Sequence, residues 1–370
     1  MSNLTHAAVF EQLEKWAPLY LAYDWDNVGL QIGSFHHPVK KIMITLDVVE
    51  DVVEEAIERE VNLIIAHHPL FFKPVHQLNL DEPKGRLVQK LMKHNITVYA
   101  AHTNLDVAVG GVNDLLCDAL GILERDVFID TYTEKLYKIA VFVPVSHMNE
   151  VLDALSDAGA GHIGNYSHCT FQTDGRGTFK PLEGTNPFIG TTNKLEKVEE
   201  VKIETIISEA KLTGAKKAII QAHPYEEVAY DIYPLRNKGK TYGIGRIGML
   251  PEKMTLQALG EHVKVAYGVP TIRVTGDLNR PVQKVAILGG SGEKYIESAQ
   301  ARGADVYITG DITYHQALDA QEMGMSIIDP GHHIEQIMKE STKKYLESAL
   351  ADDSVEIVTS AIQTEPFTFI

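Results

Sequence analysis

The chain has 370 residues, a length that allows roughly two to three domains, each with a hydrophobic core of its own. Its hydrophobic fraction of 44% and its charged fraction of 23% are ordinary for a globular protein. The formal net charge of -16 argues against nucleic acid as a partner, because affinity for its backbone depends on clustered lysine and arginine.

The cysteines and the N-terminus restrict the cellular setting. The two cysteines, Cys117 and Cys169, form no CxxC motif, which argues against a disulfide framework, a zinc finger or an iron-sulfur site and fits a reducing compartment. The first 16 residues mix charges into their apolar positions and lack the core of a signal peptide, and no apolar run reaches membrane-spanning length. We therefore expect a cytoplasmic protein without membrane contact.

The first third of the chain predicts a parallel sheet. Segments with helical apolar spacing alternate with short apolar runs that are typical of strands. A strand, a helix and a second strand follow one another as a βαβ unit, whose two strands pair in parallel. The predicted helices cover residues 4–15, 50–60 and 85–93, and the predicted strands cover a short segment ending at Gly33 and residues 41–46, 63–66 and 96–101.

The middle of the chain, residues 137–235, differs in character from both flanks. We interpret this segment as a ferredoxin-like fold, whose element order is βαββαβ, inserted into a discontinuous metal-binding α/β domain made of residues 1–136 and 236–370. The predicted strands are 138–143, 169–172, 217–221 and 228–233, and the predicted helices are 147–158 and 201–212.

The last third returns to α/β alternation. Its glycine-rich turn at residues 289–292 lacks the Gly-Lys-Ser/Thr of a P-loop, and residues 243–248 match a dinucleotide fingerprint but no helix follows them. Neither stretch predicts a nucleotide cradle of these types. The predicted strands are 285–288, 306–309 and 326–328, and the predicted helices are 293–301 and 315–323.

The stretch from Ile64 to Phe72 joins a buried strand to candidate chemistry. Its apolar start is typical of a strand buried on both faces, and it leads to His67 and His68, followed by Pro69. Adjacent residues of an extended chain point to opposite sides, so the two imidazoles are expected to serve two neighbouring metal ions. For this motif alone, a pair of capped loop histidines is the alternative.

Histidine and carboxylate side chains follow four predicted strands. In open α/β sheets, ligand sites lie outside the carboxyl ends of the strands, so we expect these side chains to meet in one crevice. The four groups are His67 and His68, His102 and Asp106, Asp311 and His315, and His332, His333 and Glu335.

Helical spacing selects the ligands of the last group. On a helix that opens after Gly331, residues three apart are neighbours, so His332 and Glu335 can chelate one ion. His333 is expected to pack in the core or to form a supporting hydrogen bond. Histidine and carboxylate donors without thiolate suit zinc, iron, manganese, cobalt or nickel.

The predicted centre holds two metal ions. Two ions about 3.5 to 4 Å apart form a hydrolytic device that activates water and stabilises a developing anion. Asp106 is the expected bridge, since a carboxylate can offer one oxygen to each ion. The alternative for Asp106 and Glu335 is a pair of solvated capping carboxylates.

Five short motifs of this chain belong together. They are Asp26-Asn27-Val28-Gly29-Leu30-Gln31, Ala66-His67-His68-Pro69, His102-Thr103-Asn104-Leu105-Asp106, Gly310-Asp311 with His315, and Gly331-His332-His333 with Glu335. In combination they resemble the NIF-three-like family, whose members are commonly labelled GTP cyclohydrolase 1 type 2 homologues.

The resemblance implies an α/β fold of two halves around a dinuclear metal centre, zinc as the first choice of metal, and toroidal homohexamers. It also implies the metal ligands His67, His68, Asp106, His332 and Glu335. Many members space the last histidine and glutamate by four residues, which leaves His332 and His333 both open.

The same resemblance extends to the insertion. Residues 137–235, above all Ala222-His223-Pro224-Tyr225-Glu226-Glu227-Val228, are similar to the PII-like and CutA-like domains that a subset of the family carries. The likeness implies that the insertion supports oligomerisation or covers the mouth of the hexamer. A sensor for a small ligand is the alternative.

The family label implies a hydrolase that takes a small-molecule substrate, possibly a nucleotide. A metal-bound hydroxide would open the guanine imidazole ring of GTP, with His102 and His315 as proton carriers, although His102 can also be an extra ligand. A metal-dependent phosphoesterase is one alternative. A metal-binding regulatory, interaction or metal-delivery protein without turnover is the other.

Overall fold

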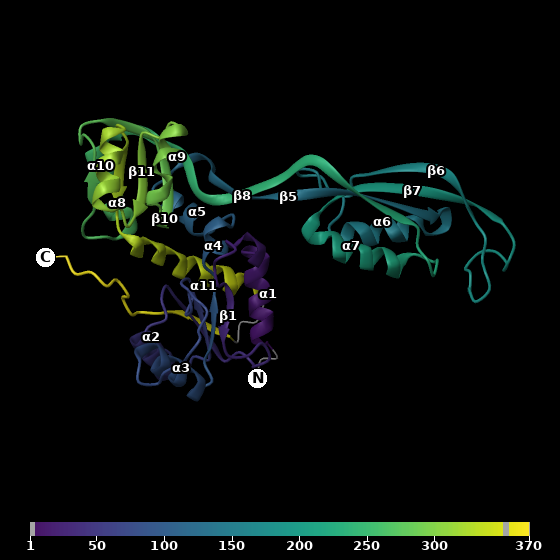
Figure 1. Cartoon of the computed structure of the whole chain (residues 1–370), viewed down its shortest axis with the longest axis horizontal. Coiled ribbons are helices and arrows are strands. Elements are labelled where there is room, and N and C mark those ends of the chain that lie inside the picture. The colour runs from purple at the N-terminus through teal and green to yellow at the C-terminus, as the bar shows by residue number, and fades with distance from the viewer. Residues whose placement is uncertain (1–3, 351–354, 370) are drawn as a thin grey trace. The chain divides into compact units, whose positions relative to one another are not determined.

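The computed structural model describes residues 4–350 and 355–369, which form two compact units. The first unit comprises Met1–Tyr132 and Tyr242–Ile370, and the second comprises Thr133–Thr241. The chain leaves the first unit along the long strand β5 (Leu123–Pro144) and returns along β8 (Tyr230–Thr255) (Figure 1). The prediction from sequence placed the ends of the insertion at residues 137 and 235.

The N-terminal half of the first unit builds one sheet. Its strand order is β1-β4-β3-β2-β13, in which β1 is antiparallel to β4 and the other neighbours are parallel. All four side chains of β3 are buried, as expected for a strand covered on both faces. The elements are β1 (Gly29–Ile32), β2 (Lys41–Thr45), β3 (Leu63–Ala66), β4 (Thr97–Ala100), β13 (Glu356–Thr359), α1 (His6–Trp16), α2 (Glu50–Glu58) and α3 (Pro83–Lys93).

The C-terminal half of this unit builds a second sheet with the order β8-β10-β11-β12-β9. Strands β10, β11 and β12 are parallel, whereas β8 and β9 are antiparallel to their neighbours. The three strands predicted for this part of the chain fall within β10, β11 and β12, while β9 was not predicted. The bounds are β9 (Arg273–Thr275), β10 (Pro281–Ser291), β11 (Val306–Gly310) and β12 (Ser326–Asp329).

One hydrophobic core joins the two sheets. Ile44 of β2, Ile287 of β10, Leu116 of α5 and Met338 of α11 belong to the same buried cluster, and α11 runs between the sheets in Figure 1. Both halves therefore form one body, in which the carboxyl ends of both sheets can contribute to a single site. The remaining helices are α4 (Thr103–Val107), α5 (Val112–Ala119), α8 (Leu256–Tyr267), α9 (Ile296–Ala301), α10 (Tyr314–Glu322) and α11 (Met338–Ala349), with the 3-10 helices η1 (Leu19–Leu21), η3 (Glu293–Tyr295) and η4 (His332–Ile337).

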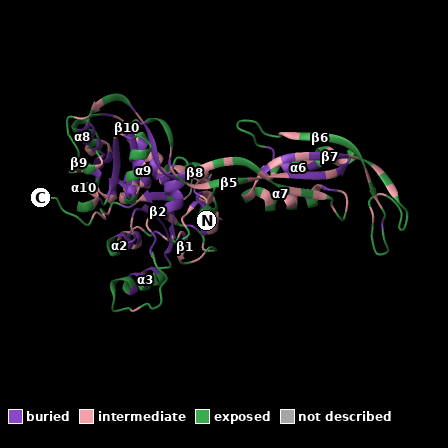
Figure 2. Ribbon diagram, turned by 45° about the horizontal axis from the view of Figure 1, so that its top comes forward, coloured by how far each residue is buried: buried purple, intermediate pink, exposed green. Residues whose placement is uncertain are grey.

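The second unit has the element order βαββαβ on which the ferredoxin-like prediction rested. Its strands are ordered β6-β7-β5-β8, and β7 is antiparallel to both β5 and β6. Val141, Val151, Ile203 and Ile219 belong to a core that is separate from that of the first unit. Strand β6 lies at the edge and is largely exposed (Figure 2). The elements are η2 (Val145–His147), α6 (Met148–Asp157), β6 (Thr170–Phe179), β7 (Glu196–Ser208) and α7 (Glu209–Ala222).

Two elements predicted for the insertion were wrong. The predicted helix 201–212 is mostly strand β7, because Val201, Ile203 and Ile207 alternate with exposed or half-buried residues at the period of a strand. The predicted strand 217–221 lies in helix α7, where Ala215 and Ile219, four residues apart, are the buried positions. Among all the residues that the structure describes, no helix is both long and apolar enough to span a bilayer.

Candidate metal centre

The site begins at the carboxyl end of β3. Backbone pairing continues beyond the strand, because the N–H groups of His67 and His68 donate to the carbonyls of Thr45 and Leu46 at 3.1 and 2.9 Å. His67 is completely buried, and its Nδ1 donates to the carbonyl of Ala101 at 2.8 Å. That bond leaves Nε2 as the nitrogen that can bind a metal ion.

Two buried polar atoms of the site have no hydrogen-bond partner among the residues that the structure describes. They are His67 Nε2 and Asp106 Oδ1, which lie 3.6 Å apart, and Glu335 Oε2 lies 3.7 Å from the same nitrogen. Leaving a buried donor or acceptor unpaired costs about 1–3 kcal/mol, so such atoms call for a ligand. Two donors bound tetrahedrally at about 2.1 Å from one ion are roughly 3.4 Å apart. These three side chains therefore fit a divalent metal ion.

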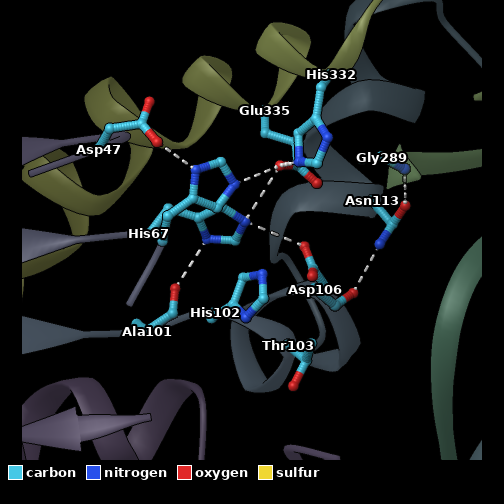
Figure 3. Close-up of polar contacts among 12 residues, drawn as sticks. Asp47, His67, Ala101, His102, Thr103, Asp106, Asn113, Gly289, His332 and Glu335 are labelled. Carbon is cyan, nitrogen blue, oxygen red and sulfur yellow. Dashed lines mark hydrogen bonds and ion pairs between the residues drawn. The ribbon is translucent and has the colours of Figure 1, made fainter. Parts of the chain in front are cut away.

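Glu335 is the carboxylate on which the site converges. It lies on η4, which begins after Gly331 as predicted but is a 3-10 helix, so that residues three apart lie on the same side. His332 Nε2 lies 3.1 Å from Glu335 Oε2 (Figure 3). His68 Nε2 lies at the same distance of 3.1 Å from that oxygen. With His67, three imidazoles surround one buried carboxylate oxygen.

His102 completes the histidine cluster. It directly precedes α4, and its ring lies edge-on to those of His67 and His68, with centroids 5.2 and 5.6 Å apart. Within the described residues the donors form three groups that could each hold a metal ion. They are His67 with His68 and His102, His68 with His332 and Glu335, and His67 with Asp106 and Glu335.

An aspartate orients each of the other three imidazoles through Nδ1. Such carboxylate–histidine pairs fix the ring and its tautomer and direct Nε2 toward a metal ion. These pairs also give a reason for the presence of three further acidic residues around a site that is already rich in carboxylates. The pairs are Asp47 with His68 at 2.6 Å, Asp26 with His102 at 2.9 Å and Asp311 with His332 at 2.7 Å.

These carboxylates raise the proton affinity of two imidazoles. Burial opposes the charged form of His68, but the hydrogen bonds with Asp47 and Glu335 outweigh it and raise the pKa of His68 to about 9. The same balance, with Asp311 and Glu335 as partners, raises the pKa of His332 to about 11. Both imidazoles therefore carry a proton at neutral pH unless a metal ion competes for Nε2.

The fully buried members of the site behave differently. Burial lowers the pKa of His67 to about 3, so its imidazole is neutral and can bind metal directly. Burial and the charge of Glu335 hold the pKa of Asp106 well above its ordinary value. Burial would also raise the pKa of Glu335, but the hydrogen bonds from His332 and His68 outweigh burial and hold it well below. Glu335 therefore ionises readily, whereas burial and the charge of Glu335 disfavour the ionised form of Asp106.

The C-terminal end of β10 approaches Glu335 closely. Gly290 has a φ of +66°, and a Cβ at this position would lie 2.7 Å from Glu335 Oε1. The N–H of Gly289 donates to Asn113 Oδ1 at 2.9 Å, and Asn113 Nδ2 donates to the carbonyl of Asp106 at 3.0 Å. These two glycines of β10 therefore connect the second sheet to the ligands of the first.

Comparison with known proteins identifies the family. A family model described as Duf34/NIF3 (NGG1p interacting factor 3) matches residues 4–366. The chain belongs to the Duf34/NIF3 family. Proteins called GTP cyclohydrolase 1 type 2 homolog from Halalkalibacterium halodurans and Bacillus subtilis are 51% and 49% identical to it over 364 residues, with 98% of each chain covered. The crystal structure of a Bacillus cereus protein related to NIF3 is 49% identical, with a TM-score of 0.94 over 100% of both chains. The predicted family and its α/β fold are confirmed.

In this Duf34/NIF3 chain, His315 lies apart from the other predicted site residues. It is exposed on α10, its ring lies edge-on to Tyr314, and it belongs to none of the three donor groups. Its role as a proton carrier stays a prediction. His333 is buried, and its Nε2 lies 3.1 Å from Gln363 Oε1, whereas His332 faces Glu335.

The sequence analysis missed the roles of the orienting aspartates of this Duf34/NIF3 site. Asp47 follows β2, so the rule that located the histidines at strand ends also applies to it. Asp26 lies in a loop, 76 positions before its partner His102, and no local pattern connects the two. Asp311 was noted at a strand end, but its bond to His332 was not predicted.

The donor groups of the Duf34/NIF3 site line a cleft of about 1040 Å³. Its wall contains the aromatic residues Trp25, Phe72 and Phe367 and the cationic residues Arg273 and Lys294. Small-molecule sites have this character, with apolar walls and a few convergent polar groups. The cleft therefore gives a small ligand access to the ligand cluster.

Metal affinity should rise with pH. His68 and His332, with pKa values of about 9 and about 11, must each lose a proton to bind metal, so their metal-binding forms become rarer as pH falls. Calorimetric titration of metal-depleted protein with zinc should give a lower Kd at about pH 8.5 than at about pH 6.5, with heats that depend on the buffer because protons are released. The variant His68→Gln should release about one proton fewer. A Kd that does not change with pH would contradict the protonated imidazoles.

Gly290→Ala should weaken metal binding by displacing Glu335. The substitution adds backbone strain on the order of 1 kcal/mol and places a methyl group against Glu335 Oε1. The matched control is Gly324→Ala, which has a φ of +74° and no atom within 4 Å of the added carbon. Thermal unfolding should show similar losses of stability in both metal-depleted variants, whereas elemental analysis should show lower metal content only in Gly290→Ala. Full metal content in Gly290→Ala would show that Glu335 tolerates displacement.

Proposed function

We propose that this chain is a hydrolase with a dinuclear metal centre. The observation that carries the proposal is the position of Glu335 Oε2, which lies within 3.7 Å of His67 Nε2 and 3.1 Å of His68 Nε2 and His332 Nε2. Glu335 therefore belongs to two donor groups at once. A shared carboxylate allows two ions to lie side by side. Asp106, the bridge expected from sequence, belongs to one of these two groups, and Glu335 fits the bridging role better.

The donor set suits two divalent ions, with zinc as the first choice and iron, manganese, cobalt or nickel as alternatives. Such a pair supplies an activated water and positive charge for a developing anion. The chain's own residues hold and move the protons. His102, oriented through Nδ1 by the nearly buried carboxylate of Asp26, presents its other nitrogen to the cluster and can accept or return a proton there.

The first substrate to test is GTP. The relatives that match nearly the whole chain are named GTP cyclohydrolase 1 type 2 homolog, which supports opening of the guanine imidazole ring as the reaction. A cleft of about 1040 Å³ beside the donor groups has room for a nucleotide. Cleavage of a phosphoester would use the same arrangement of metal ligands and His102.

Purified wild-type protein should contain about two ions per chain and should turn over GTP with release of formate. Asp106→Ala removes one donor of the buried group, so we expect loss of metal and a fall in turnover of about 100-fold or more. Elemental analysis and a formate assay on the same samples measure both effects. Asp319→Ala, which removes an exposed carboxylate on α10, is the matched control and should retain both metal and turnover.

Each contrary result has a distinct meaning. Two ions without GTP turnover would reject GTP and would direct attention to a phosphoester, a cyclic amide or a metal-binding protein without turnover. Absence of bound metal from wild-type protein and from the control would reject the metal centre itself.

We also propose that the second unit supports self-association of the chain, with a homohexamer as the expected state. Strand β6, of 10 residues, lies at the edge of its sheet and has mostly exposed side chains. Among the described residues it has a partner strand on one side only. An edge of this kind is a template for pairing with another chain. The separate core of this unit lets it act without altering the metal centre.

Removal of residues 134–240 should lower the oligomeric state and leave metal content unchanged. The cut ends can be joined by a tight Asn-Gly turn, because Thr133 Oγ1 and Thr241 Oγ1 lie 3.2 Å apart. Light scattering coupled to size-exclusion chromatography measures the assembly. A deletion variant with the same number of chains per particle and the same activity as wild type would reject a role in assembly.

A further inference from the structure

Two exposed aromatic rings lie beside the histidine cluster. Trp25 and Phe72 are 60% and 53% exposed, and both line the cleft. Each meets the imidazole of His102 edge to face, with ring centroids 6.2 and 5.7 Å apart. Large aromatic side chains that stay exposed next to a polar site are typical of a surface that a ligand covers.

Hydrogen bonds fix the two loops that carry these rings. Asp26 accepts from the N–H and the hydroxyl of Thr103 at 3.1 and 2.5 Å. Asn27 Nδ2 donates to the carbonyl of Phe71 at 2.7 Å, and the N–H of Phe71 donates to Gln31 Oε1 at 3.3 Å. The loops are thereby tied to each other and to the start of α4. The residues next to both rings in the chain are therefore fixed without a ligand.

A cation lies next to the same aromatic wall. Lys294 Nζ lies 4.9 Å from the ring centroid of Tyr295 and 5.8 Å from that of Tyr23. The two tyrosine hydroxyls are 3.2 Å apart, and the ring of Tyr23 is stacked on Trp25 with centroids 5.7 Å apart. The ammonium group and the Trp25 ring thus border one continuous surface.

Lys294 differs from Arg273, which also lines the cleft. Arg273 is ion-paired with Asp329. Within residues 4–350 and 355–369, by contrast, the ammonium group of Lys294 contacts aromatic rings and has no carboxylate partner. An ammonium group without a carboxylate partner at the edge of a cleft attracts an anionic group of a ligand.

We propose that this cleft binds a planar heteroaromatic ring on Trp25 and an attached phosphate at Lys294, so that its ligand is a nucleotide. The inference rests on the proposed function in taking this cleft as the substrate site. Stacking on Trp25 favours a flat ring, and the ammonium group of Lys294 favours a negatively charged phosphate. A ring seated on Trp25 lies beside His102 and therefore next to the donor groups.

Tryptophan fluorescence gives a direct test, because Trp16 and Trp25 are the two tryptophans of the chain. Trp16 is stacked on Tyr345 and does not line the cleft, so Trp16→Phe leaves Trp25 as the single emitter. This variant, purified with its metal, is titrated with guanosine, GTP and tripolyphosphate. Guanosine and GTP should quench the emission, and tripolyphosphate alone should not.

Calorimetry on single variants separates the ring from the charge. Trp25→Ala should weaken binding of both guanosine and GTP on the order of 10-fold. Lys294→Met should weaken binding of GTP by a similar factor, on the order of 10-fold, and should leave guanosine unaffected. Tyr166→Ala and Lys93→Met remove an exposed ring and an exposed cation outside the cleft and should change neither affinity.

The proposal is overturned if guanosine does not quench Trp25, or if Trp25→Ala binds both ligands as tightly as wild type. A change of oligomeric state in Trp25→Ala without a change in affinity would also overturn it, since the ring would then belong to an interface between copies. Binding that depends on Trp25 and Lys294 without GTP turnover would support this inference and reject the GTP reaction. GTP turnover that neither substitution changes would reject this inference and support the GTP reaction.

Discussion

The structure depends on one buried carboxylate. Ionised oxygen is expensive to remove from water unless positive charge and hydrogen bonds replace the solvent. Glu335 is 3% exposed, and three imidazoles surround its Oε2 at 3.1 to 3.7 Å. The end of β3 supplies two of these rings and η4 supplies the third together with Glu335. The glycines near the C-terminal end of β10 leave room for the carboxylate, so both sheets contribute to its surroundings.

Negative charge around this point exceeds what the protein itself neutralises. Each of three imidazoles has an aspartate behind it, and Asp106 adds a carboxyl group that burial keeps from ionising readily. The protonated rings of His68 and His332 balance part of that charge. Divalent cations would balance the remainder and replace the protons, which links occupancy of the site to its own acid–base chemistry.

The sequence was informative where a rule of chain direction applied. Parallel strands bring their carboxyl ends to one edge, which was sufficient to bring His67, His68 and Asp106 together, and three-residue spacing was sufficient for His332 and Glu335. The sequence did not predict contacts between residues far apart in the chain that no chain-direction rule connects. The hydrogen bond between Asp26 and His102, which are 76 positions apart, is an example. In the insertion, short apolar runs fitted both periodicities, and only packing against a shared core separated β7 from α7.

The contact between His68 and Glu335 joins residues 267 positions apart in the chain. During synthesis the two histidines that follow β3 leave the ribosome long before η4 does, and the entire second unit is made in between. A nascent chain therefore has imidazoles but lacks the shared carboxylate, so it cannot build either of the donor groups that contain Glu335. Metal loading into those groups would therefore be a step of maturation, and bound ions would help to close a loop whose ends, His68 and Glu335, lie 267 positions apart.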